Sequence, residues 1–289
     1  MSSDLGMNVT PDLPHEVNFK FGWQWRERCP ASVRHRRGYD GRGNSLMQQR
    51  IAEEGQGHIA YDPEWLSEAT PELFDPHHLG VQGMLSSFGS GRGTVWLFRH
   101  EDTEYALRHY HRGGKVAQFL GDRYLWTGLN RSRPAREAKI LQELAGKGLP
   151  VPNPVAWRVI RSGLMYRADL IVTRISRARS LTQILRERAL AVAEWENLGM
   201  LLRRFHDLQV WHADLNLSNI LLQPSGDFFL IDFDRCRIRF GKLWKQRNLK
   251  RLHRSCLKEQ AQNPEFHFSE QDFDVLLQGY ARGAPAADS

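Results

Sequence analysis

One short polar stretch between apolar flanks constrains this chain more than any other. Residues 210–222 read VWHADLNLSNILL, which puts His212, Asp214 and Asn219 in a loop between two apolar segments. Residues 230–235 read LIDFDR, so Asp232 ends the apolar run 228–231. Each polar residue alone fits a simple turn, because Asp and Asn side chains bond readily to their own backbone. The fixed spacing and the two apolar strands favour a shared chemical role instead.

Phosphoryl transfer needs such a set of residues. One carboxylate orients the attacking hydroxyl, and two oxygen ligands hold magnesium on the phosphates. Mg²⁺ prefers hard oxygen donors. The order His-x-Asp-x-x-x-x-Asn, then a strand that ends in Asp-Phe, is that of a kinase catalytic loop and metal loop. The pattern predicts Asp214 as the catalytic residue and Asn219 and Asp232 as the Mg²⁺ ligands.

A glycine-rich segment precedes this loop by about 120 residues. Residues 87–98 read SFGSGRGTVWLF, with Gly89, Gly91 and Gly93 at alternate positions between strand-like segments. Glycines let backbone N–H groups approach phosphate oxygens closely. A hairpin turn explains the same pattern, so the segment by itself is a weak sign of an ATP-phosphate loop.

The next strand and helix supply a cation and a carboxylate. Residues 104–110, EYALRHY, predict a strand in which Arg108 occupies the position where many kinases carry a phosphate-binding lysine. An arginine keeps the charge but changes its geometry from a point to a planar fork. Glu137, on the predicted helix 133–144, would pair with Arg108 in a kinase. Two alternatives stay open: Arg108 is a surface residue, or Glu137 pairs with Arg133 or Lys139 of its own helix.

The composition narrows the classes of protein. The chain has 40 Lys and Arg against 33 Asp and Glu, a net charge of +7. This excess favours anionic partners, although a solvated basic surface explains it equally well. The three cysteines, Cys29, Cys236 and Cys256, fit neither a disulfide framework nor a zinc motif, which suits a reducing cytoplasm. No apolar run approaches the ~20 residues of a membrane-spanning helix, and no signal peptide is predicted.

The rest of the chain predicts mostly helices and strands. Residues 1–46 lack apolar periodicity and are expected to be a disordered, dispensable extension; Met47 is an alternative start. Tyr61–Leu66 suggests a short helix. Further strands are expected at 155–160 and 168–175, and further helices at 180–188, 191–208, 244–258 and 269–280. The helix 244–258 is strongly basic, and either packs with its charges solvated or contacts an anionic membrane surface, with Trp244 at the headgroup level.

Several of these stretches together resemble the lipopolysaccharide kinases of Gram-negative bacteria. They are GSGRGTVW at 89–96, ALRHYHRGG at 106–114, DRYLW at 122–126, GLPVPNP at 148–154, HADLNLSNILL at 212–222, IDFDR at 231–235 and RNLKRLHRS at 247–255. The combination of LRHY-x-RGG, HADLN and IDFD is specific, and it is not expected in an ordinary protein kinase. The resemblance covers most of residues 85–258.

The resemblance implies an α+β, two-lobed protein-kinase-like fold with a small β-rich N-lobe and a larger helical C-lobe. The expected division is 1–46 extension, 47–172 leading segment and N-lobe, 173–283 C-lobe and 284–289 flexible tail. It also implies ATP-dependent, Mg²⁺-assisted phosphorylation of the 4-hydroxyl of 3-deoxy-D-manno-octulosonic acid (Kdo) on the Kdo–lipid A precursor. Such an enzyme works as a peripheral protein at the cytoplasmic face of the inner membrane, with no nucleic-acid partner. In this family the position of Arg108 also carries arginine.

Two other functions compete with this one. A kinase for a soluble molecule such as an aminoglycoside shares the same loop motifs, but the arginines after Asp232 argue against its usual acidic pocket. A pseudokinase that only binds a partner is the second alternative. Arg108 and Asp234, which replaces the usual Gly after Asp-Phe, are its only support, whereas the intact Asp214, Asn219 and Asp232 oppose it.

Overall fold

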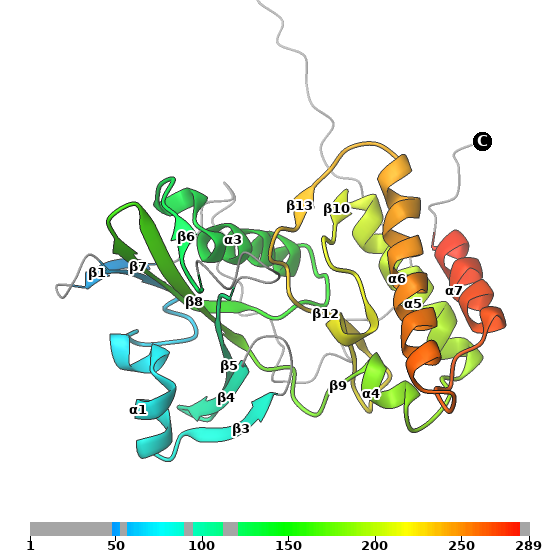
Figure 1. Cartoon of the computed structure of the whole chain (residues 1–289), viewed down its shortest axis with the longest axis horizontal. Coiled ribbons are helices and arrows are strands. Elements are labelled where there is room, and N and C mark those ends of the chain that lie inside the picture. The colour runs from blue at the N-terminus through cyan, green and yellow to red at the C-terminus, as the bar shows by residue number, and fades with distance from the viewer. Residues whose placement is uncertain (1–47, 53–56, 90–94, 112–120, 284–289) are drawn as a thin grey trace, which may run out of the picture. The chain divides into compact units, whose positions relative to one another are not determined.

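The computed structural model describes residues 48–52, 57–89, 95–111 and 121–283, and for 48–52 and 87–89 it describes the backbone only. All of them belong to one compact unit, Gly38–Ser289. The expectations for residues 1–46, Gly91, Gly93 and 284–289 lie outside the described residues. The fold is α+β, as predicted, with a sheet-rich lobe and a mainly helical lobe (Figure 1).

An antiparallel sheet forms the first lobe. Its strands follow the order β1-β2-β7-β8-β5-β4-β3, and β6 pairs with the start of β8. The bounds of the strands are β1 Gln48–Ala52, β2 Gly57–Tyr61, β3 Leu85–Gly89, β4 Val95–His100, β5 Thr103–His109, β6 Tyr124–Leu125, β7 Pro154–Ser162 and β8 Met165–Thr173. The predicted strands at 104–110, 155–160 and 168–175 are confirmed within a few residues. The lobe boundary expected at 172–173 stays a prediction.

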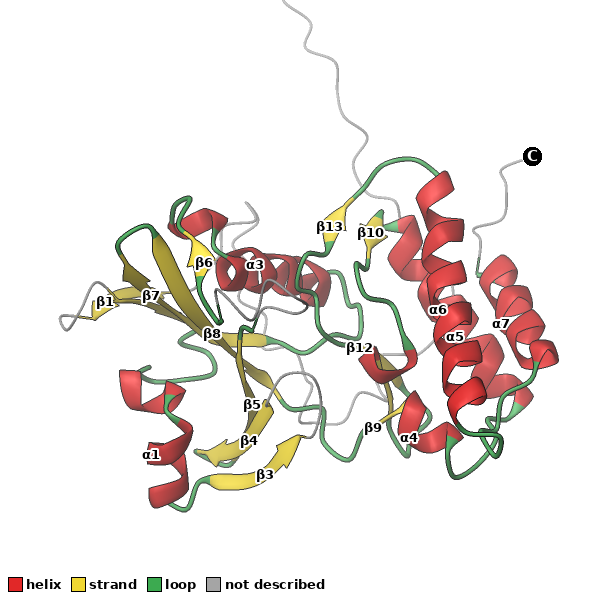
Figure 2. Cartoon of the chain, viewed as in Figure 1, coloured by secondary structure: helices red, strands yellow, loops and turns green. Residues whose placement is uncertain are grey.

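Both faces of this sheet are covered. Side chains alternate along a strand, so Leu170 of β8 packs with helix α3 (Arg133–Gly146) while Ile171 faces the other side. On that second side lie the 3₁₀ helix η3 (Pro71–Phe74) and α1 (Pro76–Val81), which Figure 2 shows against the strands. The residues that lead into the sheet are therefore part of its core.

Two local expectations before β3 need revision. The helix expected at Tyr61–Leu66 is a turn, in which the Asp62 carbonyl accepts from the N–H groups of Trp65 and Leu66. One turn is too short to sustain a helix. Strands β1 and β2 were not predicted, because their hydrogen bonds come from each other and from β7, far along the chain.

The second lobe is built from helices with short strands between them. The helices are α4 Leu181–Leu185, α5 Val192–Asp207, η5 Leu217–Asn219, α6 Leu243–Gln262 and α7 Glu270–Arg282; the strands are β9 Arg179–Ser180, β10 Val210–Trp211, β11 Ile220–Leu222, β12 Phe228–Leu230 and β13 Arg237–Ile238. All four predicted helices of this lobe exist. Ser180 and Ser269 accept from the N–H groups of Gln183 and Asp272 and so act as the predicted N-caps.

Helices α5 and α7 pack unusually closely. A Cβ atom on Gly199 would collide with the backbone of Leu276 and Tyr280, and one on Gly279 would collide with the backbone of Glu196. Only glycine allows the two helix backbones to approach this far. This pair supports α5, the helix that leads into the catalytic loop.

The basic helix α6 is longer than predicted, and the alternative that placed its Trp244 at the headgroup level of a membrane is wrong. Trp244 is buried, 3% exposed, and its ring packs edge-on against His206 with 5.0 Å between the centroids. Trp244 therefore belongs to the core of the lobe and does not lie at a membrane surface. Leu249, Leu252 and Cys256, which form one apolar stripe along this helix, are buried.

Candidate active site

The predicted catalytic loop runs between β10 and β11. Asn219 Nδ2 donates to the backbone carbonyl of Asp214 at 2.9 Å, and the N–H of Asn219 donates to Asn216 Oδ1 at 3.0 Å. These bonds fix the loop in a compact form. The bond to Asp214 uses the amide nitrogen of Asn219 and not its amide oxygen. The Asp214 carboxylate remains 48% exposed, so a substrate hydroxyl can reach it.

Helix α6 supports this loop from the side, which the sequence did not reveal. Asn248 Nδ2 donates to the carbonyl of His212 at 2.8 Å, and the N–H of Leu217 donates to Ser255 Oγ at 3.3 Å. Between them, Arg251 Nη2 donates to Asp214 Oδ1. The stretch RNLKRLHRS carried the resemblance, but it gave no sign that one face of its helix holds the catalytic loop.

The metal loop begins at Asp232, directly after β12. Asp232 has a left-handed backbone with φ of +63°, a conformation that Asp tolerates better than most residues. Phe233 is buried and stacks on Phe205 of α5, with 6.2 Å between the centroids. His212 links the two loops, because its Nε2 donates to the carbonyl of Ile231 at 3.0 Å. Burial lowers the pKa of His212, which favours the neutral ring.

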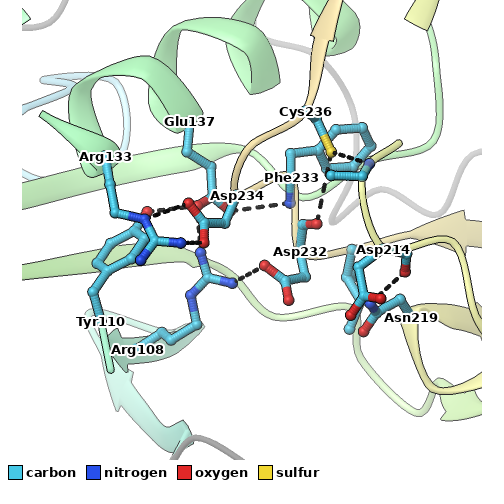
Figure 3. Close-up of polar contacts among 12 residues, drawn as sticks. Arg108, Tyr110, Arg133, Glu137, Asp214, Asn219, Asp232, Phe233, Asp234 and Cys236 are labelled. Atoms are coloured by element: carbon cyan, nitrogen blue, oxygen red, sulfur yellow. Dashed lines mark hydrogen bonds and ion pairs between the residues drawn. The ribbon is translucent and has the colours of Figure 1, made fainter. Parts of the chain in front are cut away.

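Arg108 lies between two carboxylates (Figure 3). Its Nη2 donates to Glu137 Oε2 and its Nη1 to Asp232 Oδ1. The predicted pair of Arg108 with Glu137 is therefore confirmed, and the alternatives within the helix are not. The contact to Asp232 was not predicted. It joins the sheet, α3 and the metal loop at one guanidinium.

Burial and charge act on this cluster in opposite directions. Burial raises the pKa of Glu137 to about 7, although Arg108 opposes that rise. Burial would also raise the pKa of Asp232, but Arg108 outweighs it and holds that pKa below its usual value. Glu137 accepts further bonds from the Tyr110 hydroxyl and the Phe233 N–H, so it organises the metal loop as well as Arg108.

Asp234, which stands where kinases usually carry glycine, has a partner of its own. Arg133 at the start of α3 donates to it through both Nε, at 2.8 Å, and Nη2. Such a forked contact is among the stronger ion pairs in proteins. The ion pair ties the end of the metal loop to α3, which is a physical reason for the loop to stay in place.

The residues of the two loops fit a magnesium ion held together with phosphates. Mg²⁺ commonly takes one or two protein oxygens and completes its shell with phosphate and water. Asn219 and Asp232 offer such oxygens, and the described residues contain no cluster of three or more His, Cys, Asp or Glu that would hold a metal alone. Gly89 ends β3 and pairs with Val95 of β4, and the predicted phosphate-binding role of Gly89, Gly91 and Gly93 stays a prediction.

Comparison with known proteins decides the family. A sequence model of the Lipopolysaccharide kinase (Kdo/WaaP) family matches residues 78–280. The chain belongs to this family, and it is a phosphotransferase.

Curated relatives agree with this assignment. The chain is 43% identical over 222 residues to a 3-deoxy-D-manno-octulosonic acid kinase of Photobacterium profundum, covering 77% of this chain and 94% of the relative. It is 38% identical to a protein of the same name from Vibrio vulnificus, over 78% and 95% of the two chains. A third, from Mannheimia succiniciproducens, is 41% identical over 72% of this chain and 89% of the relative.

Within the residues that the structure describes, no helix has the length and apolar character needed to cross a membrane.

Proposed function

We propose that this protein transfers the γ-phosphoryl group of ATP to the 4-hydroxyl of Kdo on the Kdo–lipid A precursor, in the biosynthesis of the lipopolysaccharide inner core. The observation that carries the proposal is the joining of Asp214, Asn219 and Asp232 in one site, in a chain whose relatives are named Kdo kinases. The alternative of a kinase for a soluble molecule has no such support. The intact carboxylates, together with the family, also disfavour a pseudokinase.

Each predicted site residue has a role in this reaction. Asp214 orients the Kdo hydroxyl and accepts its proton as the bond to phosphorus forms. Asn219 and Asp232 would hold Mg²⁺, which neutralises charge on the ATP phosphates. Arg108, held by Glu137, contacts those phosphates from the sheet lobe.

The glycines at 89, 91 and 93 complete the proposed ATP site. Gly89 lies at the end of β3, so the loop that follows begins at the edge of the sheet that carries Arg108. Backbone N–H groups of a glycine-rich loop can approach the phosphates closely.

The acceptor resides in a membrane, so the enzyme needs a surface that meets lipid. Although Trp244 is buried, Phe240 in the connection between β13 and α6 is 85% exposed, and Leu243, the first residue of α6, is 77% exposed. Arg239 and Lys242 beside them are exposed. We propose that this connection docks the enzyme peripherally on the cytoplasmic face of the inner membrane. Each cation near an anionic surface contributes roughly 1 kcal/mol.

Vesicle binding tests this docking. Phe240→Ser with Leu243→Ser should strongly reduce co-sedimentation with vesicles that contain an anionic phospholipid. Val81→Ser with Val192→Ser, which removes side chains 72% and 64% exposed elsewhere, is the matched control. Equal binding by both double variants would refute the docking assignment.

The reaction itself is tested with Asp214→Asn. The wild type should transfer phosphate from ATP to Kdo–lipid A precursor and not to an aminoglycoside. The variant should bind ATP normally and lose transfer by on the order of 10²–10⁴-fold, the usual contribution of a general base. Transfer at the wild-type rate would show that Asp214 is not the catalytic residue. If adding the Kdo–lipid A precursor did not change the rate of ADP release, the precursor would not be the substrate.

A further inference from the structure

A pocket lined by arginines opens beside the start of α3. Its volume is about 260 Å³, and four guanidinium groups line it. They come from separate segments: the 3₁₀ helix η4 (Leu129–Arg131), the first turn of α3 and the end of the metal loop. The arginines are Arg131, Arg133, Arg136 and Arg235.

The charges of this pocket are largely uncompensated. Only Arg133 has a carboxylate partner, Asp234; no ion pair joins the other three arginines to any of the described residues. No acidic side chain belongs to the described lining of the pocket. Like charges that converge on one hollow repel each other, so the arrangement favours binding of an anion.

One side of the pocket is preorganised around Arg133. The Arg133 guanidinium carbon lies 4.6 Å from the centre of the Tyr124 ring, and the Arg133 N–H donates to the Tyr166 hydroxyl at 3.0 Å. Arg133 and Arg136 stand in the first turn of α3, where the helix dipole adds positive potential. A ligand therefore meets Arg133 already held in place, whereas Arg131, Arg136 and Arg235 are exposed side chains that it must order when it binds.

The ATP phosphates are not the ligand of this pocket. The residues assigned to them, Arg108 and Asp232, are not in its described lining, and Arg133 contacts the metal loop through Asp234. Arginine forks suit the oxygens of a phosphate monoester, which carries nearly two negative charges at neutral pH. The proposed acceptor carries such phosphates on its lipid A part.

We propose that this pocket binds a phosphate monoester of the lipid A part of the acceptor and so positions Kdo toward Asp214. The proposal rests on the proposed function, whose acceptor supplies the phosphate. It assigns recognition of the lipid A phosphates to arginines other than Arg108, at a pocket that the end of the metal loop also lines.

A binding titration tests the pocket without any turnover. The probes are the lipid A sugar backbone without acyl chains, with and without its phosphates, and inorganic phosphate. The wild type should bind the phosphorylated sugar at least about tenfold more tightly than the unphosphorylated one, since the charge-assisted bonds are lost without phosphate. Arg131→Gln with Arg136→Gln should abolish this preference.

A matched control separates the pocket from net charge. Lys139→Gln with Lys147→Gln removes two exposed charges from α3 or its C-cap, outside the pocket, and should keep the preference. Loss of the preference in both double variants would overturn the proposal. Inorganic phosphate that binds as tightly as the phosphorylated sugar would also overturn it, because the pocket would then be a site for free phosphate.

Kinetics give the second readout. With phosphorylated acceptor, the Arg131/Arg136 variant should raise the acceptor KM about tenfold and leave the KM for ATP unchanged. With dephosphorylated acceptor, variant and wild type should be equal; equal losses on both acceptors would overturn the pocket. A wild type that binds the phosphorylated sugar but transfers nothing to Kdo would refute the proposed function alone.

Discussion

Arg108 and Arg251 each hold one aspartate of the site, but in different surroundings. The Arg108 side chain is 22% exposed and its partner Glu137 only 3%, whereas Arg251 and Asp214 are 45% and 48% exposed. Breaking a buried ion pair typically costs about 3–5 kcal/mol, because the remaining charge has no partner. An exposed pair contributes about 0–1 kcal/mol.

The two ion pairs differ in their partners and in their exposure to solvent. Arg108 has two carboxylate partners, Asp232 and Glu137. Glu137 also holds the metal loop, because it accepts from the N–H of Phe233. Among the described residues, Arg251 pairs with the single carboxylate of Asp214, and both side chains are exposed to solvent. We infer that the first pair keeps the site assembled, and that the second orients Asp214 and yields when the substrate hydroxyl arrives.

The largest effect is expected where the buried pair is altered. Arg108→Lys keeps the charge but not the fork that reaches Glu137 and Asp232 together. One lost charge-assisted hydrogen bond is worth about 1.5–3 kcal/mol, so kcat/KM for ATP should fall about 10- to 150-fold. Arg167→Lys, on the neighbouring strand β8, is the control. Normal ATP turnover in Arg108→Lys would reduce Arg108 to a structural residue.

The pH dependence of kcat/KM tests the buried pair of Arg108 and Glu137 in a second way. Because the pKa of Glu137 is raised to about 7, its carboxylate is protonated as pH falls through that value and the pair with Arg108 weakens. The value of kcat/KM for ATP should fall up to about tenfold per pH unit below 7, as a single protonation demands. Glu137→Gln should lower the activity at pH 8 and remove this limb.

Thermal stability distinguishes this titration from acid unfolding. The folded pKa of Glu137 lies above its unfolded value of 4.5, so this carboxyl stabilises the fold fully below 4.5 and loses that contribution as pH rises through 7. Its effect on melting temperature is therefore opposite to its effect on activity. An acid limb that persists in Glu137→Gln would assign the limb to another group.

The smallest effect is expected at the exposed pair. Arg251→Gln should lower kcat by less than about tenfold and leave the KM for ATP unchanged, because it changes only the orientation of Asp214. Its effect on unfolding should stay below about 1 kcal/mol. Arg254→Gln, an exposed arginine three residues further along α6, is the control. An unchanged kcat in Arg251→Gln would show that this ion pair has no part in the reaction.

The contact between Arg251 and Asp214 limits which residues of α6 can be used to test its binding to lipid. Arg251 is one of several cations on α6, and it contacts Asp214, the predicted catalytic residue. Neutralising it would lower activity for a reason unrelated to membrane binding. Arg247, Lys250 and Arg254 are exposed, and they are the residues with which the lipid contact of α6 can be examined.

Local pattern was sufficient where a residue acts through its neighbours in the chain. The loop from His212 to Asn219 could be predicted because its function requires fixed spacing, and α5 because its apolar residues repeat at helical intervals. Strands β1 and β2 could not be predicted, since their partners are each other and β7. Pattern also failed at Trp244, where the side of a helix that faces the core depends on the neighbouring helix.

The sequence by itself predicted the class of fold and the catalytic and metal loops, and it gave the pair of Arg108 with Glu137 as one of several alternatives. These depend on short motifs whose chemistry dictates their order. Only the tertiary structure decided that Arg251 of α6 reaches Asp214, that Arg133 holds Asp234, and that arginines from three segments line one pocket. Such contacts join residues 37 to 101 positions apart, and they arise from the packing of whole elements, which no local spacing encodes.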